Sequence, residues 1–326
     1  MLNKLRLETD ALRSHGWKRY LTVLTRRISM RFRQSVLRQR YVIKRFPNFR
    51  MYLDLEDNGI SRTLAIAGSR EEDQIAILKR ELRNGMTVVD IGSNVGYYPL
   101  LASTLVGGTG KIYSAEPSPQ NFELLSKNIE LNSLSDMIHA LPIGISNSTG
   151  KAIFYLHQQA NLHTLNPKKY HDFKESVHFD ELQIDVVAIA DFMRDKEPID
   201  LIRMDIEGHE VEVLESLSMA VSEDGASPIV LFENHFPKYD ETQHSMRTQL
   251  IHLFRLGYYA KTMVSTDESV SKFHEMGYTP ETVIKADGVL RGLYEDVPND
   301  DAVKLICEIG YVRATLLARN TQDVQR

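Results

Sequence analysis

A carboxylate and two glycines mark the segment DIGSNVG (residues 90–96), which follows a short valine-rich run typical of a buried strand. A helix-like run begins directly after it. Glycine lets a ligand come close to the backbone, and the free N–H groups at a helix start bind ligand oxygens. The Gly-x-x-x-Gly spacing differs from the Gly-x-Gly-x-x-Gly of dinucleotide-binding dehydrogenases. Asp90, two residues before the first glycine, favours a ligand with a cationic group over a pyrophosphate. A glycine turn that binds nothing is the alternative.

A second acid, Glu116, ends the next predicted strand, KIYSAE at residues 111–116. The carboxyl ends of parallel strands line the ligand crevice of open α/β sheets. A carboxylate there can accept hydrogen bonds from both ribose hydroxyls of an adenosine, although capping of the next helix together with Ser118 is an alternative role. Combined with Asp90 and the glycine spacing, Glu116 favours S-adenosylmethionine over NAD as the ligand.

Two later predicted strands, at residues 199–205 and 229–233, are each followed by acids and a histidine. In a doubly wound sheet both strands flank the same crevice, so we expect these groups to meet beside the ligand. One chemistry is proton removal by His209 or His235, poised near neutral pH and oriented by a carboxylate. The candidate catalytic residues are Asp205, Glu207, His209 and His235.

A metal site at these strand ends is the second chemistry. Asp205, Glu233 and Asn234 offer the oxygen ligands that a hard divalent cation such as Mg²⁺ prefers, and the cation would lower the pKa of an acceptor hydroxyl. For Glu207 and Glu210, stabilisation of a helix N-terminus by negative charge is a further alternative. The sequence leaves the base and the metal open.

A histidine-rich polar segment at residues 158–180 joins two short strands predicted at 152–157 and 183–187. The spacing of its histidines fits no compact metal site. We expect a lid that faces the substrate, and its candidate contacts are Asn161, His163 and Thr164.

Composition excludes several classes of protein. Cys307 is the single cysteine of the 326 residues, which excludes an internal disulfide and a cysteine-based zinc site and fits a reducing compartment. No run of about 18 uncharged apolar residues occurs, and the N-terminus lacks the apolar core of a signal peptide. We therefore expect a cytoplasmic protein without a transmembrane helix.

The N-terminal region is strongly basic. Residues 1–50 hold 14 Lys and Arg against 2 Asp and Glu, whereas the whole chain carries a net charge of −5. Apolar residues recur there at helical spacing, at Leu21, Leu24, Ile28, Phe32 and Val36. This pattern predicts a basic amphipathic helix that fits an anionic membrane surface, so we expect association with the membrane periphery. Docking on the protein's own acidic surface or on a second subunit of a homo-oligomer is the alternative.

Strands and helices alternate regularly from residue 86 onward. This alternation predicts an α/β fold with a doubly wound, Rossmann-like, mostly parallel seven-stranded sheet that carries helices on both faces. We expect a basic helical arm with short strands at 1–55, one domain at 56–326, and an insertion at 265–310. The predicted strands are 88–91, 111–116, 138–145, 199–205, 229–233, 258–264 and 311–319.

Several motifs of this chain, in the same order, resemble those of FkbM-type S-adenosylmethionine-dependent methyltransferases. The resemblance runs from about residue 58 to about residue 236 and rests on DNGIS at 57–61, Glu71, VDIGSNVGYY at 89–98, AEPSP at 115–119, Asn128, Asn132, IRMDIEGHE at 202–210 and ENH at 233–235. It implies a class I methyltransferase that acts on a hydroxyl oxygen of a sugar, glycan or secondary metabolite. Two residues depart from the family pattern: Arg203, where lysine is usual, and His209, where a small residue is common.

The resemblance also implies which residues contact the cofactor. Carried over one by one, these are Glu71, Asp90, Gly92, Ser93, Asn94, Gly96 and Glu116, with Pro117 beside the last. Two other functions were weighed. A nucleic-acid methyltransferase would suit the basic arm, but the Asn/Asp-Pro-Pro-Tyr motif is missing after residue 204 and no cysteine lies nearby. A non-catalytic binding module would not need the acids at three strand ends. We therefore expect a small-molecule or glycan hydroxyl acceptor and no nucleic-acid partner.

Overall fold

The computed structural model describes residues 21, 24–26, 28–57, 59–157, 162–166, 180–236, 239 and 245–320. Its main sheet has the strand order β12-β13-β11-β14-β10-β9-β3-β4-β5. The strands are β3 (Thr87–Ile91), β4 (Lys111–Ala115), β5 (Ile138–Leu141), β9 (Leu201–Met204), β10 (Ile229–Glu233), β11 (Tyr258–Ser265), β12 (Thr282–Ala286), β13 (Val289–Val297) and β14 (Val312–Arg319).

The centre of this sheet is parallel, with β10, β9, β3, β4 and β5 paired in that order. From β3 the chain order runs outward in both directions, so the sheet has its switch point between β3 and β9. β14 is antiparallel to both β10 and β11. The prediction of a doubly wound, mostly parallel α/β sheet is confirmed.

The sheet has nine strands instead of the predicted seven. The two additional strands, β12 and β13, come from the region predicted as an insertion and form an antiparallel hairpin at the sheet edge. Asp287 and Gly288 join them, both with positive φ. An Asp-Gly pair between two β-rich runs is a strong hairpin signal, because a two-residue turn of this kind needs positive φ at both positions.

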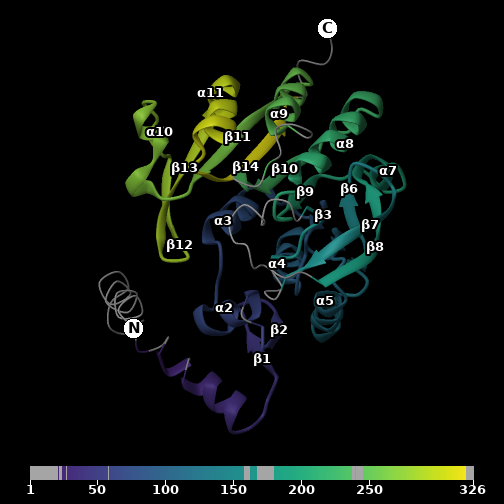
Figure 1. The fold of residues 1–326 in the computed structure, drawn as a ribbon, viewed down its shortest axis with the longest axis vertical. Coiled ribbons are helices and arrows are strands. Elements are labelled where there is room, and N and C mark those ends of the chain that lie inside the picture. Colours follow the sequence, from purple (N-terminus) through teal and green to yellow (C-terminus); the bar gives the residue numbers. More distant parts are fainter. Residues whose placement is uncertain are drawn as a thin grey trace.

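Helices cover both faces of the sheet (Figure 1). One face packs against α8 and α9 through leucines such as Leu214 and Leu250. The other packs against α3, α4 and α5, through Ile77, Leu100 and Leu125. The described helices are α2 (Ile60–Ala67), α3 (Glu72–Glu81), α4 (Tyr97–Val106), α5 (Pro119–Leu131), α7 (Ile189–Arg194), α8 (Glu210–Glu223), α9 (Met246–Arg255), α10 (Lys272–Glu275) and α11 (Asn299–Lys304), with a 3₁₀-helix at Glu268–Val270 and a π-helix at Leu305–Ile309.

A second, three-stranded sheet lies beside the main one, with the order β6-β8-β7. It contains β6 (Gly144–Ser146), β7 (Gly150–Leu156) and β8 (Asp180–Ala188). The prediction of one continuous strand over 138–145 is therefore wrong. Pro142 lies between β5 and β6; proline has no N–H to donate and ends the ladder, so the chain leaves the main sheet there.

In the described part of the N-terminal region, residues 21, 24–26 and 28–35 are helical, and the chain continues into the antiparallel hairpin of β1 (Tyr41–Arg45) and β2 (Arg50–Asp54). Met51 and Leu53 of β2 are fully buried and belong to the same core cluster as α4 and α5. The helical residues lie at the end of the molecule beyond this hairpin (Figure 1). In the described part of the chain, none of the helices has both the length and the apolar character needed to cross a bilayer.

Candidate active site

The loop after β3 packs directly against the end of β9. Gly92 has φ +79°, and a Cβ at this position would meet the carbonyl oxygen of Asp205. Gly96 precedes α4 with φ +92°, and its Cβ would lie 2.8 Å from a methyl of Leu125. Both glycines are therefore required by backbone conformation and by close packing. The loop brings the ends of β3 and β9 together.

Glu116, after β4, anchors the same loop. Its two carboxylate oxygens accept hydrogen bonds from the backbone N–H groups of Asn94 (2.8 Å) and Ser118 (2.9 Å). The side chain is buried, and burial raises the pKa of Glu116 to about 7. Contact with Ser118 at the start of α5 means that the residue supports the helix start and also borders the crevice.

A cleft opens at the carboxyl ends of these strands, between the main sheet and the smaller one. Its lining combines polar groups of the strand ends with apolar side chains near the smaller sheet: Ile91, Gly92, Asn94, Ala115, Glu116, Pro117, Asn121, Ile143, Gly144, Ile145, Phe154, His163, Thr164, Leu165, Asp205, Ile206, Glu207 and His209. Four of the predicted cofactor residues are among them, namely Gly92, Asn94, Glu116 and Pro117. An apolar wall facing polar groups suits a ligand with a planar apolar part and a hydroxylated part.

The other predicted cofactor residues lie deeper. The Ser93 hydroxyl donates to the Asp90 carbonyl at 2.9 Å. One carboxylate oxygen of Asp90 lies 3.4 Å from Arg203, and the other, Oδ2, is buried without a hydrogen-bond partner in the described part of the chain. Burial raises the pKa of Asp90. A buried acceptor without a donor is costly, so this oxygen fits a cationic or hydrogen-bonding group of a ligand.

Glu71, at the start of α3, pairs with several charged side chains. It accepts a hydrogen bond from the Tyr98 hydroxyl at 2.6 Å, and its carboxylate pairs with Arg70 at 2.6 Å and Arg313 at 3.1 Å. Burial alone would raise the pKa of Glu71, but these guanidinium groups lower it. Glu71 also has φ +53°, a conformation that residues other than glycine adopt at a cost. The surrounding charges hold this carboxylate ionised.

The residues predicted at the ends of β9 and β10 meet around His235. Its Nδ1 lies 2.9 Å from Glu210. Its Nε2 lies 3.8 Å from Asp205 and 3.6 Å from both Glu207 and Glu233. Burial would lower the pKa of His235, but the surrounding carboxylates, first of all Glu210, raise it to about 10. The surrounding carboxylates, with Glu210 foremost, therefore hold the imidazole as a cation.

Two of these acids, Asp205 and Glu233, form ion pairs with arginines. Burial opposes ionisation of Asp205, but Arg203 at 3.1 Å lowers the pKa of its carboxyl to about 2. Glu233 pairs with Arg313 through one oxygen and lies 3.4 Å from the Gln74 amide through the other. Burial, reinforced by the charge of Asp205, nevertheless raises the pKa of Glu233 to about 8.

Two of the three predicted metal ligands lie close together. Within the described chain, Asp205 and Glu233 form a metal-sized group with His235, and the ligand atoms of these residues lie within 4.8 Å of one another. Asn234 donates its side-chain amide to the hydroxyl of Thr315 at 2.9 Å. Its role as a ligand stays a prediction.

His209 belongs to a different cluster. Its Nε2 lies 2.9 Å from the Ser146 hydroxyl of β6, and its Nδ1 lies 3.5 Å from Glu212. His209 lines the cleft next to the smaller sheet, whereas His235 occupies the cluster of strand-end acids. The two histidines predicted as alternative bases are thus in different environments.

A family model described as the methyltransferase FkbM domain matches residues 90–280, more than half of the chain. The chain belongs to the FkbM methyltransferase family. The resemblance drawn from the sequence motifs is confirmed.

Individual relatives of this FkbM-family protein are distant. It is 28% identical over 155 residues to the methyltransferase sdnD of Sordaria araneosa, covering 40% of this chain and 60% of that protein. It is 26% identical over 153 residues to the hexuronic acid methyltransferase AglP of Haloferax volcanii, covering 46% and 58%. The matches therefore span about three fifths of each relative.

Similar solved structures include an FkbM methyltransferase from Methylobacillus flagellatus KT, with a TM-score of 0.35, 15% identity and coverage of 58% of this chain and 46% of that one. An O-methyltransferase from Bacillus cereus in complex with SAH has a TM-score of 0.40 at 9% identity, covering 78% and 84%.

In this FkbM-family chain, residues 162–166 of the segment predicted as a lid belong to the described structure, and they border the cleft. His163 packs edge-on against Phe154, and its Nδ1 accepts the backbone N–H of His157 at 2.9 Å. Burial lowers the pKa of His163 to about 4, so its ring is neutral. Thr164 pairs with Tyr155 of β7. Asn161, the third candidate contact, lies outside the described residues.

One residue of the site, Arg313, has no signal in the local sequence. Arg313 comes from β14 and contacts both Glu71 and Glu233, so it links the carboxylate at the start of α3 to the carboxylate at the end of β10. No local motif surrounds it, and only the sheet order brings it there. Glu210 fits its expected place at a helix start, because its carboxylate accepts hydrogen bonds from the Ile206 and Gly208 N–H groups; it also accepts one from His235.

Proposed function

We propose that this protein transfers a methyl group from S-adenosylmethionine to a hydroxyl oxygen of a sugar, glycan or secondary metabolite. Membership of the FkbM family supports methyl transfer. The methyltransferase AglP, a relative named for hexuronic acid, supports a sugar as the acceptor. The observation that carries the proposal is the cleft at the switch point of the sheet, together with a buried carboxylate oxygen of Asp90 that has no hydrogen-bond partner among the described residues.

The residues present fit this cofactor. Asp90 would face its cationic amino end, and Glu116 would accept the ribose hydroxyls. The apolar side chains of Ile143, Ile145 and Phe154 would contact the adenine. S-adenosylmethionine supplies an activated methyl group on a sulfonium, so the protein has to position the acceptor oxygen and remove its proton.

His235 is the group we assign to proton removal, with Glu210 as the residue that orients its ring. The Nδ1–H of His235 donates a hydrogen bond to Glu210, which leaves Nε2 directed at the strand-end acids, where an acceptor hydroxyl could bind between Asp205 and Glu207. A cation placed in the neighbouring cleft would lower the pKa of His235 and favour its neutral, basic form. His235 thus becomes a base when the ligand site is filled.

We further propose that the reaction needs no divalent metal. A cation such as Mg²⁺ would require oxygens of Asp205 and Glu233, and these carboxylates are already paired with Arg203 and Arg313. Two positive guanidinium groups next to the candidate ligands also oppose a further cation. Activity that is unchanged in EDTA supports the base; activity that is lost in EDTA and restored by Mg²⁺ favours the metal.

Glu116→Gln should weaken S-adenosylmethionine binding at least tenfold. The two carboxylate oxygens of Glu116 each accept a hydrogen bond from a backbone N–H group. In the glutamine variant an NH₂ group replaces one of these oxygens, so a buried side-chain donor would face a backbone donor. Such an unsatisfied group costs about 1–3 kcal/mol of stability. Isothermal titration with the cofactor and a thermal melt measure both effects.

The matched control is Glu123→Gln, an exposed acid on the neighbouring α5 that pairs with the exposed Lys127. It should bind the cofactor as the wild type does. Equal cofactor affinity of the Glu116 variant and the wild type would contradict the assigned contact.

The experiment that tests the function has two stages. In a thermal-shift assay, S-adenosylmethionine should raise the melting temperature of the protein, because a ligand that binds the native state stabilises it. Transfer of a labelled methyl group to a panel of glycans and metabolite extracts, with and without EDTA, then identifies the acceptor class. No shift at millimolar cofactor would overturn the proposal, as would label found on nitrogen or carbon instead of oxygen.

A further inference from the structure

The N-terminal helix, meaning helical residues 24–26 and 28–35, is attached to the rest of the protein by one face. Arg26 donates to the carbonyl oxygens of Ile66 and Ala67 at 3.0 and 3.3 Å, at the carboxyl end of α2. One turn later Met30 is buried, and a further turn on Gln34 donates to the Leu55 carbonyl at 2.6 Å. These positions are four residues apart, so they share one face. That face is fixed on the body by polar contacts and one apolar side chain.

The opposite face carries an apolar stripe that faces away from the protein. We define the outward stripe as Leu24, Ile28 and Phe32, which are 36%, 60% and 54% exposed. Its members are also four residues apart and are offset by two positions from the attached face, which corresponds to about 200° around a helix. Large apolar side chains are rarely left in water as a contiguous set, and such a set marks an interaction surface.

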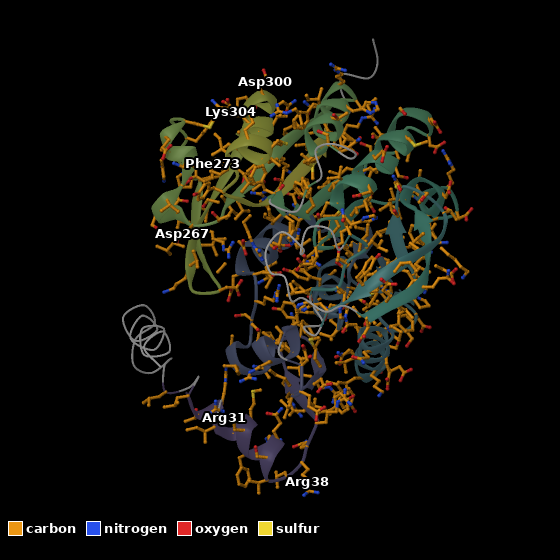
Figure 2. All side chains as sticks on the ribbon, in the orientation of Figure 1. Arg31, Arg38, Asp267, Phe273, Asp300 and Lys304 are labelled. Atoms are coloured by element: carbon orange, nitrogen blue, oxygen red, sulfur yellow. The ribbon has the colours of Figure 1, made fainter. Side chains whose placement is uncertain are left out.

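The charge around the outward stripe is positive. Arg31 and Arg33 are exposed on the same helix, and Arg38 follows it. Figure 2 shows Arg31 and Arg38 at the extreme end of the molecule. No acidic residue occurs in the sequence between Asp10 and Asp54. The surface that would cover this stripe is therefore apolar at its centre and anionic at its edges.

We propose that the outward stripe docks on the surface of a membrane that contains anionic lipids. Apolar side chains would enter the boundary between headgroups and acyl chains while the arginines contact lipid phosphates. The other occupants fit less well. Two copies of so basic a helix would repel each other, and a nucleic acid offers no apolar surface to Leu24, Ile28 and Phe32.

The attachment of the helix has a consequence for this docking. The guanidinium of Arg26 and the amide of Gln34 hold the helix against α2 and the end of β2, so the helix is presented in a defined orientation. A docked helix would therefore set the orientation of the whole domain on the lipid surface.

Vesicle sedimentation with the full-length protein tests the proposal without relying on the methyl-transfer activity. Vesicles of phosphatidylcholine with about 30 mol% phosphatidylglycerol should bind the wild type at least about tenfold more tightly than pure phosphatidylcholine, and raised salt should weaken binding. The double variant Ile28→Ser/Phe32→Ser should lose at least about tenfold in affinity for the anionic vesicles.

The matched control is Val283→Ser/Leu290→Ser, which removes two exposed apolar side chains, 47% and 52% exposed, from the β12–β13 hairpin, a separate element of the fold. This variant should bind vesicles as the wild type does. The proposal fails if the wild type does not bind anionic vesicles, or if the stripe variant binds them as well as the control. It also fails if size-exclusion chromatography with light scattering shows a wild-type dimer that Ile28→Ser/Phe32→Ser converts to a monomer. Such a result would make the stripe a subunit interface.

Discussion

Replacing His235 with glutamine is expected to lower kcat by about a hundredfold to ten-thousandfold, the usual contribution of a positioned general base. Cofactor affinity should change little, because His235 lies among the acids at the ends of β9 and β10 and is not part of the cleft lining. Single-turnover methyl transfer with saturating cofactor measures the chemical step directly.

The pH profile distinguishes a base from a structural histidine. Because the pKa of His235 is raised to about 10, only a small fraction of the free enzyme carries the neutral ring at pH 7. The wild-type kcat/KM should therefore rise as the pH increases from 7 toward 10, whereas the His235→Gln profile should be flat over this range. A flat profile for the wild type would contradict proton removal by His235.

Glu210→Gln provides the positioning control for the same residue. The Glu210 carboxylate is the main group that raises the pKa of His235, so its removal should lower that pKa. The rising limb of the profile should then move to lower pH, which a merely structural role of Glu210 would not produce. His209→Gln tests the alternative base: if it abolishes turnover while His235→Gln does not, the assignment belongs to the Ser146–His209 cluster.

The arrangement of the site could be predicted in part because parallel strands bring their carboxyl ends to one edge. Asp90, Glu116, Asp205 and Glu233 each lie at or next to the end of an apolar strand, and the structure places these strands side by side. The periodicity that identified the strands therefore also located these acids. The fold class followed from the same alternation of strands and helices.

Other features depended on contacts between distant parts of the chain. Arg313 reaches Glu233 from 80 residues away, because β14 inserts antiparallel next to β10. The contact of Asn234 with Thr315 also depends on β14, which lies next to β10 in the sheet but about 80 residues later in the sequence. The β12–β13 hairpin did have a local signal, the Asp287-Gly288 turn, which lay inside a region interpreted as an insertion.

Gly92→Ala is the second substitution with a large expected effect. The residue has φ +79°, which costs an alanine about 1–2 kcal/mol. Its Cβ would also overlap the carbonyl oxygen of Asp205 and touch a methyl of Ile206, and forcing atoms into such a packed position costs about 1–3 kcal/mol more. The free energy of unfolding should fall by about 2–5 kcal/mol in total, as measured by urea denaturation.

The same change should remove cofactor binding, for a geometric reason. The N–H groups of Gly92 and Ser93 both donate to the Ala115 carbonyl, so the loop is held between β4 and β9 and cannot move aside. Relief of the overlap would have to displace the end of β9, where Asp205 lines the cleft.

Gly108→Ala is the control for this substitution, since a Cβ at Gly108 would have no atom within 4 Å in the described structure. It should change stability by no more than about 0.5 kcal/mol. If Gly92→Ala unfolds at the same urea concentration as Gly108→Ala and still binds the cofactor, the loop is not packed against β9 as described.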